Sequence, residues 1–325
     1  MLTNNYVQDE DAMFRFDYKI PFLRWALTPP GYYKNWLLGV RGGKKNTLFA
    51  FIGGIPVNVV VNGKEVKMCE INYLCVHHKL RAKKLAPVLI KEITRRVNCE
   101  KIWQAIYTAG PTIPTPFGHA TYWHRNINCK KLIDIKFSSL KAGVPLSRHI
   151  RLHKLPENPS IAGIRPMKAK DIENVRNLLN NDLEKNTKVH FHWSSDEVRH
   201  FLLPQQDIIY SYVVEEKGQI TDFFSFYSLP SSVLKENPGD HKTLSAAYSY
   251  YNVSTTGRIK EGLADMLIFA EKNKFDVYNC LDLHRNDIEI LKDLKFGIGD
   301  GRLHYYFYNW RIHTADSKDI GIVLV

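Results

Sequence analysis

Glu70–Val76 is rich in strand-forming residues and would place Ile71, Tyr73 and Cys75 on one face, which predicts a strand. A basic turn follows, and from Leu85 to Val97 apolar residues recur every three or four positions, which predicts a helix. Pro87 is tolerated there because the first turn of a helix does not use that N–H. The order strand, basic loop and helix N-terminus gathers cations and free backbone N–H groups, which suits a phosphorylated ligand. An ordinary surface connection has the same order, so both interpretations stay open.

Further elements are predicted in the first half of the chain. A strand is expected at Ile102–Tyr107, and a proline-rich irregular loop then leads to Tyr122-Trp123-His124-Arg125. Asn62-Gly63 is a typical hairpin turn. A meander, one helix after a basic loop and a further strand resemble the layout of acyl-CoA-dependent N-acyltransferases. The meander consists of three antiparallel strands, predicted at Thr47–Phe51, Ile55–Val61 and Glu65–Val76.

The second half repeats this order of elements, and the expected boundary at Asn158–Pro166 separates domains 1–160 and 161–325. Asp171 is placed to cap a helix, and Ser194 and Glu197 form a Ser-x-x-Glu capping box. The repeated order predicts an α+β fold of two tandem domains. Later strands are expected at 207–215, 220–229, 246–253, 275–281 and 304–310, and a helix at 260–272.

Composition is that of a globular protein, since 44% of the 325 residues are hydrophobic and 24% are charged. The net charge of +12 favours an anionic partner, such as nucleic acid, an acidic membrane surface or a phosphorylated cofactor. The basic residues are dispersed, however, and an unspecialised basic surface stays open. The most apolar run, Thr47–Val61, is broken by glycine and proline, so we expect no integral membrane protein. Five widely spaced cysteines indicate reduced thiols in a cytosolic or nuclear compartment, and we expect a cytoplasmic protein.

Two short motifs have competing interpretations. His190 and His192 flank Phe191, but without a third ligand we expect no metal site. Lys295–Gly301 reads KFGIGDG, which indicates either a tight loop or a place where a backbone approaches something closely.

A run of three acidic residues precedes a cluster of aromatic residues near the start of the chain. In a basic chain this is a local reversal of charge, which fits either a solvated acidic turn or a small pocket for a cationic peptide. The residues are Asp9, Glu10, Asp11, Phe14, Phe16 and Tyr18.

Two stretches resemble the signatures of the glycylpeptide N-tetradecanoyltransferase (N-myristoyltransferase) family. Glu70–His78 reads EINYLCVHH and is similar to the family's EINFLCVHK, with Tyr73 and His78 as the differences. Lys295–Gly301 matches the second signature, KFGxGDG. The resemblance runs from about Tyr6 to the last residue and includes IYTAG, YWHR and TDFFSFYSLP.

This resemblance implies tandem N-acyltransferase (GNAT-like) domains related by a pseudo-twofold axis, with acyl-CoA in the first and most of the peptide groove in the second. The implied reaction transfers a myristoyl group from myristoyl-CoA to the α-amine of an N-terminal glycine. Implied substrates begin Gly-x-x-x-Ser/Thr, with a basic residue favoured downstream. Myristoyl-CoA is a substrate; no prosthetic group and no nucleic acid are implied, and a monomer is expected.

The resemblance also assigns catalytic groups. The main-chain amides of Tyr73 and Leu74 are the implied oxyanion hole, so a tyrosine in place of phenylalanine is compatible with activity. The C-terminal carboxylate of Val325 is the implied general base, and burial raises such a pKa from about 3.5 in water. Asn72 and Thr108 are implied to hold the glycine amine.

Binding residues are implied in the same way. At Ala82 the family usually has serine, so one phosphate hydrogen bond is expected to be lost. The acyl-CoA residues are Leu74, Cys75, Val76, Arg81, Ala82, Lys83, Lys84, Leu85 and Ala86. The peptide residues are Val7, Asp9, Asp11, Phe14, Phe16, Tyr18, Gly110, Tyr122, His124, Tyr227, Ser231, Tyr248, Asn279, Asp300 and Leu324.

Family members carry some tens of residues before the point that matches Met1, and these contact the adenine and cover part of the acyl chain. We therefore expect a first domain that is incomplete at its start. The alternative is a truncated, weakly active or inactive remnant that binds acyl-CoA or peptide. Transfer of a short acyl group to another amine is disfavoured by the tandem length and the KFGIGDG motif. A nucleic-acid binder is disfavoured because the aromatic residues alternate within strands.

Overall fold

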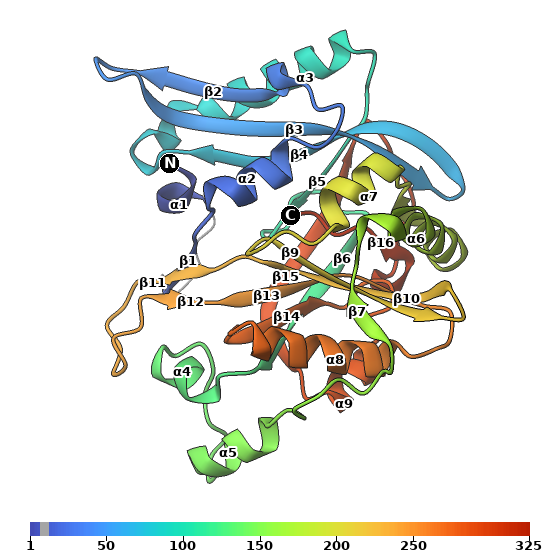
Figure 1. Ribbon diagram of the computed structural model, residues 1–325. Coiled ribbons are helices and arrows are strands. Elements are labelled where there is room, and N and C mark those ends of the chain that lie inside the picture. Colours follow the sequence, from blue (N-terminus) through green and yellow to red (C-terminus); the bar gives the residue numbers. More distant parts are fainter. Residues whose placement is uncertain (7–12) are drawn as a thin grey trace.

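The computed structural model describes residues 1–6 and 13–325. One long mixed sheet runs through the molecule, with helices packed on it (Figure 1). The strands are β1 (Phe14–Phe16), β2 (Leu37–Gly42), β3 (Thr47–Val61), β4 (Lys64–Val76), β5 (Ala105–Ala109), β6 (Gly118–Asn126), β7 (Ile164–Pro166), β8 (Val189–Phe191), β9 (Ile209–Glu216), β10 (Gln219–Ser228), β11 (Ser231–Val233), β12 (Thr243–Leu244), β13 (Ala246–Ser254), β14 (Val277–Leu281), β15 (Gly297–Tyr308) and β16 (Ile320–Gly321). The helices are α1 (Leu2–Asn5), α2 (Ile20–Leu27), η1 (Lys34–Trp36), η2 (His78–Lys83), α3 (Leu85–Cys99), α4 (Cys129–Asp134), α5 (Leu146–His153), η3 (Ala169–Asp171), α6 (Ile172–Asn186), α7 (Ser195–Leu202), α8 (Ile259–Lys272), α9 (Ile288–Asp293) and η4 (Ser317–Asp319).

The two halves of the large sheet have equivalent strand orders, starting from its centre between β15 and β6. In the first half β2, β3 and β4 form an antiparallel meander, α3 follows, and β5 pairs parallel to β4. In the second half β9, β10 and β13 do the same, α8 follows, and β14 pairs parallel to β13. β15 then pairs antiparallel with β5, and β6 pairs antiparallel with β14. This arrangement confirms the predicted tandem α+β fold, with a pseudo-twofold axis between β15 and β6.

The two halves exchange a strand at that axis. β15 comes from the end of the chain, yet it lies between β5 and β6 of the first half and pairs with both. The sheet therefore continues across the predicted boundary near residue 160, which itself stays a prediction. A separate small sheet of β1, β11 and β12 also joins the two halves.

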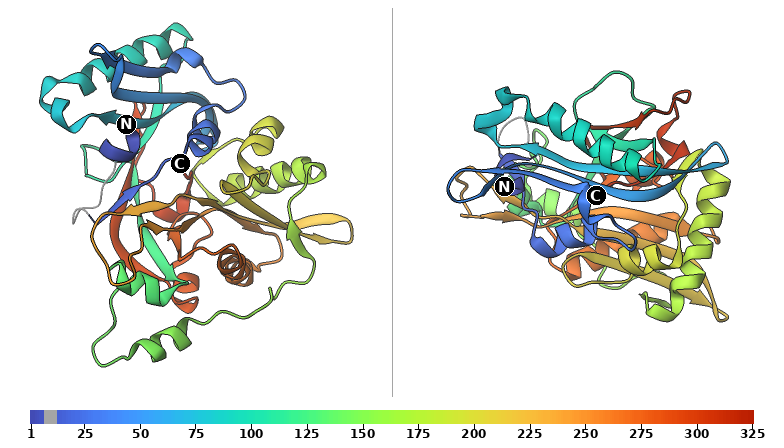
Figure 2. Two further views of the ribbon diagram at one scale, coloured as in Figure 1. Left: turned by 60° about the vertical axis from the view of Figure 1, so that its left-hand side comes forward. Right: turned by 90° about the horizontal axis from the view of Figure 1, so that it is seen from above.

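The core is divided between the sheet and its helices. α3 covers β3 and β4 at one end of the molecule, and α8 covers β10 and β13 at the other (Figure 1). α3 buries Leu89, Ile93 and Val97, the periodic positions that predicted it. The largest cluster lies between the halves and contains residues of both, such as Val59 and Phe223. The C-terminal end lies in the middle of the molecule (Figure 2).

Two sequence predictions of strand ends were wrong. β3 is one continuous strand, not two strands that end and begin beside Gly53 and Gly54. A Cβ on Gly53 would lie 2.8 Å from Leu27, and one on Gly54 would lie 2.7 Å from Cys69, so the glycines permit close packing there. Likewise, Lys295–Gly301 is not a loop throughout, because β15 begins at Gly297 and pairs with β6 across an irregularity.

Local capping signals were more reliable. The hairpin at Asn62-Gly63 is present, with positive φ at both residues. Ser194 and Glu197 form the predicted capping box at α7. Asp171 does lie at the start of α6, but its carboxylate accepts a hydrogen bond from the N–H of Lys168 and pairs with Arg165 instead of capping the helix.

Among residues 1–6 and 13–325, no helix combines the length and the apolar character needed to cross a bilayer.

Candidate active site

The central strand β4 contains a bulge. Tyr73 and Leu74 of β4 lie opposite a single residue of β3, Ile52, because the register shifts there. Tyr73 adopts a left-handed backbone conformation, with φ of 58°. A bulge of this kind leaves backbone groups of the extra residue without partners in the ladder. The bulge therefore offers main-chain groups to a ligand.

The second half has a bulge at the equivalent place, but it is closed. Tyr250 and Tyr251 of β13 lie opposite Ser225 of β10. The Ser225 hydroxyl accepts a hydrogen bond from the N–H of Tyr251 and donates one to its carbonyl oxygen, both at 3.0 Å. Ile52 has no polar side-chain atom and cannot fill the first bulge in this way.

A large apolar cavity opens beyond the first bulge. β4 and β5 pair only at Cys69 with Ala105 and at Glu70 with Ile106, and then separate. A cavity of about 570 Å³ lies there against α3. Several of its apolar side chains are exposed, including Ile90 at 44% and Trp103 at 52%. Its other apolar lining residues include Ile71, Leu74, Ile93, Val97, Tyr107, Ile113 and Tyr308.

A second cavity of about 410 Å³ lies on the other side of the bulge and is rich in aromatic residues. Tyr227 and Tyr248 stack in its wall, with ring centroids 5.3 Å apart. His124 lies 2.7 Å from Asn279, and burial lowers the pKa of this histidine, so its imidazole is neutral near pH 7. The two cavities meet, because both are lined by Tyr6, Asn72, Tyr73, Thr108 and Gly110.

Asn72 is oriented at this junction by a buried acid. Its Nδ2 donates a hydrogen bond of 2.5 Å to Oε1 of Glu70, which is 4% exposed. Burial raises the pKa of Glu70 to about 7. Because the side-chain nitrogen Nδ2 of Asn72 is engaged, the side-chain oxygen Oδ1 is the group left to accept a hydrogen bond from a ligand.

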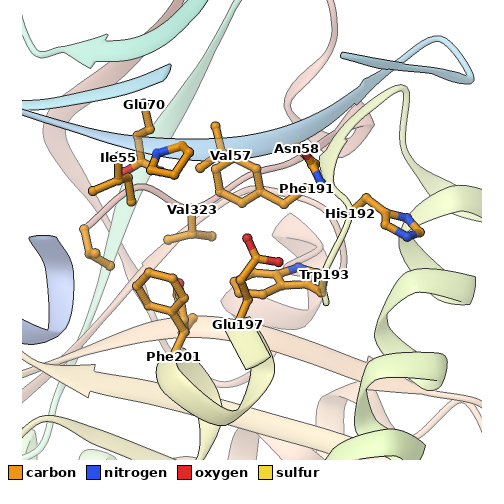
Figure 3. A pocket seen from close by; sticks show the side chains of 13 residues that line it. Ile55, Val57, Asn58, Glu70, Phe191, His192, Trp193, Glu197, Phe201 and Val323 are labelled. Carbon is orange, nitrogen blue, oxygen red and sulfur yellow. The ribbon is translucent and has the colours of Figure 1, made fainter. Parts of the chain in front are cut away.

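The last residues of the chain reach the same place. Leu324 and Val325 both line the 410 Å³ cavity. The Tyr305 hydroxyl donates to the carbonyl oxygen of Ile322 at 3.0 Å, which helps to hold the segment. Val325 and Glu70 also line a small neighbouring pocket. The walls of this pocket are mostly apolar and include Phe191, Trp193 and Phe201 (Figure 3).

The basic loop lies at the edge of this region. η2 ends before Lys84, which has φ of 55°, and α3 begins at the next residue. Arg81 donates to the carbonyl oxygen of Asn5, and the side chains of Lys83 and Lys84 are exposed. The predicted residues Arg81–Ala86 line neither cavity. Arg81, Lys83 and Lys84 are exposed cations at the start of α3, whereas Leu85 is half-buried and packs against the core.

Most of the predicted site residues lie together. Leu74 lines only the apolar cavity, and Asp300 is exposed and lines neither cavity. Val7, Asp9 and Asp11 lie outside the described residues. The predicted residues that line the 410 Å³ cavity are Phe14, Phe16, Tyr18, Asn72, Tyr73, Thr108, Gly110, Tyr122, His124, Tyr227, Ser231, Tyr248, Asn279, Leu324 and Val325.

Sequence reasoning missed several lining residues. Tyr6, Phe137 and Leu229 line the aromatic cavity, and Trp103 and Tyr308 line the apolar one. One signal was available for the apolar cavity: α3 has apolar residues such as Ile90 outside the face that it buries. No local signal marks the others, because they come from distant elements.

Comparison with known families gives matches over nearly the whole chain. Residues 1–120 match the description "Myristoyl-CoA:protein N-myristoyltransferase, N-terminal domain", and residues 134–323 match the C-terminal domain of the same family.

Individual relatives and a solved structure agree with these matches. Glycylpeptide N-tetradecanoyltransferase 1 of Arabidopsis thaliana is 51% identical over 328 residues, which covers 100% of this chain and 75% of the relative. Glycylpeptide N-tetradecanoyltransferase of Plasmodium falciparum is 49% identical over 325 residues, which covers 100% of this chain and 78% of the relative. A crystal structure of Saccharomyces cerevisiae N-myristoyltransferase with bound myristoyl-CoA has a TM-score of 0.94 at 38% identity and covers 100% of this chain and 85% of that one.

Proposed function

The chain belongs to the myristoyl-CoA:protein N-myristoyltransferase family, and we propose that the family's reaction takes place where its two cavities meet. The chain is an acyltransferase that moves a myristoyl group from myristoyl-CoA to an N-terminal glycine. The observation that carries the location is the shared lining. An open apolar cavity and an aromatic cavity have Asn72, Tyr73, Thr108 and Gly110 in common, so an acyl donor and a peptide can meet there.

The apolar cavity is the proposed place of the acyl chain. Its lining from α3, β4 and β5 is mostly apolar, and burial of each methylene group there contributes about 0.8 kcal/mol to binding. The separated edge of β4 at Leu74–Val76 is proposed to pair with the pantetheine. The cations of Arg81–Lys84, beside the N-terminus of α3, are proposed to attract the phosphates of coenzyme A.

The bulge is the proposed oxyanion hole. When an amine attacks the thioester carbon, the carbonyl oxygen becomes negative and needs fixed donors. The N–H groups of Tyr73 and Leu74 suit this role because the bulge removes them from regular pairing with β3. One such donor contributes about 3 kcal/mol to transition-state stabilisation.

Asn72, Thr108 and Val325 are proposed to handle the amine. The carbonyl oxygen of Asn72 and the hydroxyl of Thr108 accept hydrogen bonds from the ammonium, and the Val325 carboxylate takes its proton. The amine nitrogen then attacks the thioester carbon, and the C–S bond breaks as an amide bond forms. The coenzyme A thiolate leaves and takes the second proton that the nitrogen loses as the amide forms. The position of Val325 in the lining of the aromatic cavity supports this assignment.

The aromatic cavity is the proposed peptide groove. Its tyrosines offer apolar rings and polar hydroxyls to an extended peptide. We propose substrates that begin Gly-x-x-x-Ser/Thr, and the acidic Asp300 near the cavity favours a basic residue downstream. We also propose that the chain acts as a monomer in the cytoplasm, and its five free cysteines support a reducing compartment.

A transfer assay tests the proposed function. Purified chain is mixed with myristoyl-CoA and a peptide that starts Gly-x-x-x-Ser-Lys, beside a control peptide that starts with alanine. We expect coenzyme A release and a mass gain of one myristoyl group on the glycine peptide alone. No transfer by a chain that melts cooperatively would contradict catalysis and favour a binding remnant.

The general base is tested by semisynthesis of the C-terminal segment. Replacing the Val325 carboxylate with a carboxamide removes its charge and keeps the side chain. The single-turnover rate should fall by about 10²-fold or more, since general base catalysis is lost, while acyl-CoA affinity stays unchanged. The control is the same ligation with a carboxylate; a wild-type rate for the amide would exclude this base.

A further inference from the structure

Cys129, His149 and His153 form a cluster outside the linings of the two cavities. Cys129 is the first residue of α4, and the two histidines lie one turn apart on α5. One donor atom from each side chain can be chosen so that all three lie within 4.8 Å of one another. α4 and α5 lie at the bottom of Figure 1, away from β4 and the C-terminal end, and none of the three residues lines either cavity.

The two histidines of this cluster lie side by side, with ring centroids 4.2 Å apart. Nδ1 of His153 lies 3.0 Å from the carbonyl oxygen of His149, and since a carbonyl only accepts, this nitrogen carries the proton. The lone pair of His153 is therefore on Nε2. A hydrogen bond of this kind from the second ring nitrogen is the usual support of a metal-binding histidine.

The third member is a buried thiol. Cys129 is 4% exposed. A transition metal ion removes the thiol proton on binding because the thiolate is the ligand. One thiolate and two imidazoles make a nitrogen and sulfur donor set, which suits zinc and excludes magnesium and calcium, whose sites consist of oxygen ligands.

We propose that Cys129, His149 and His153 bind one Zn²⁺ ion, with water in the fourth tetrahedral position. The thiol proton is released to solvent on binding. From the sequence, only His190 and His192 were considered as metal ligands, and no site was expected there because a third ligand was lacking. The fold brings them together by packing α5 against α4.

Zinc at this place would fasten α5 to the molecule. α5 buries none of its residues. Its backbone is held from outside by Arg125, which donates to the carbonyl oxygen of His153, and by Lys295, which donates to that of Leu152. These two cations oppose a metal ion, and the Cys129 thiolate offsets part of that repulsion. We therefore expect weaker binding than at a closed site of four protein ligands.

A cobalt titration of the reduced, metal-free chain tests this proposal. Co²⁺ bound to a thiolate gives a near-ultraviolet charge-transfer band. We expect one Co²⁺ per chain with this band, displaced by Zn²⁺. Cys129→Ser should remove the band, and His153→Ala should weaken Zn²⁺ binding by more than about 10-fold, because loss of an outer partner alone costs that much.

The exposed Cys99 provides the matched control. Cys99→Ser should keep the band, and Zn²⁺ should raise the Tm of the wild type and Cys99→Ser but not of Cys129→Ser. If Cys129→Ser does not fold, His149→Ala and His153→Ala test the same site, since neither histidine is fully buried. Absence of the band in the folded wild type, or a band that survives Cys129→Ser, would overturn the proposal.

Discussion

The Tyr73 side chain has a hydroxyl that is buried and makes no hydrogen bond within the described residues. A buried polar group without a partner costs about 1–3 kcal/mol. Tyr73→Phe should therefore raise the free energy of unfolding by about 1 kcal/mol. It should leave the rate of acyl transfer unchanged, because the proposed donor is the backbone N–H. Urea unfolding and the transfer assay measure the two effects.

Tyr251→Phe is the opposing control for this substitution. The Tyr251 hydroxyl bonds to backbone atoms of Gly321 and Val323, so its removal should destabilise the chain. Lower stability or a slower transfer rate for Tyr73→Phe would show that the hydroxyl has a partner or a role in catalysis.

The buried acid Glu70 makes a second residue-level prediction. Its pKa is raised from 4.5 to about 7 in the folded chain. The folded state therefore binds the Glu70 proton more tightly than the unfolded state. Protonated Glu70 stabilises the fold at low pH, and this stabilisation is lost as the pH rises from about 4.5 to about 7. The difference is of the order of 3 kcal/mol.

Glu70→Gln removes that ionisation and keeps an acceptor for Asn72. Relative to the wild type, the variant should gain about 3 kcal/mol in free energy of unfolding between pH 4 and pH 8. Urea unfolding at the two pH values measures it. Exposed Glu65 on the same strand is the control, and a difference between Glu70→Gln and wild type that does not change with pH would contradict the raised pKa.

Sequence prediction at the residue scale succeeded where the signal was local. The Ser194 capping box needs only four consecutive residues, and it is present. Asp171 has the right residue type for a cap, but Arg165 lies near it and competes for its carboxylate. Tyr6 and Leu229 could not be predicted as site residues, since their place depends on how distant elements pack.

Elements were predicted well where periodicity alone defines them. α8 begins one residue before its expected start and ends at its expected end, and α3 begins at Leu85 as expected and ends two residues beyond Val97, because each helix buries a regular apolar face. β2 was not predicted, because its pairing with β3 cannot be read from a single segment. β3 was predicted as two strands, because the close packing at Gly53 and Gly54 that keeps it continuous cannot be read from the sequence either.

Gly262 in α8 tests the contact between that helix and the sheet. A Cβ at this position would lie 1.9 Å from Cζ of Phe224 on β10. Alanine favours a helix by about 1 kcal/mol over glycine, but overpacking a core costs about 1–3 kcal/mol or more. With so short an approach we expect the clash to dominate and Gly262→Ala to lower the Tm.

The exposed Glu261 is the neighbouring control, and Glu261→Ala should change the Tm little. A higher Tm for Gly262→Ala would mean that α8 can move away from β10 at no cost.

The molecule as a whole should unfold as one unit. β15 fills the space between β5 and β6, and the largest apolar cluster includes residues of both halves. We expect fluorescence and circular dichroism to report one coincident urea transition, and a fragment of residues 1–160 to show none. Two separate transitions, or cooperative unfolding of the fragment, would show that the halves fold independently.

The exchanged strand also has a consequence for biosynthesis. β5 leaves the ribosome early, but the strand that covers its edge is made only at 297–308. An uncovered strand edge is a template for pairing with other chains. From the synthesis of β5 until its last strands emerge, the nascent chain therefore carries an open strand edge that can pair with other chains.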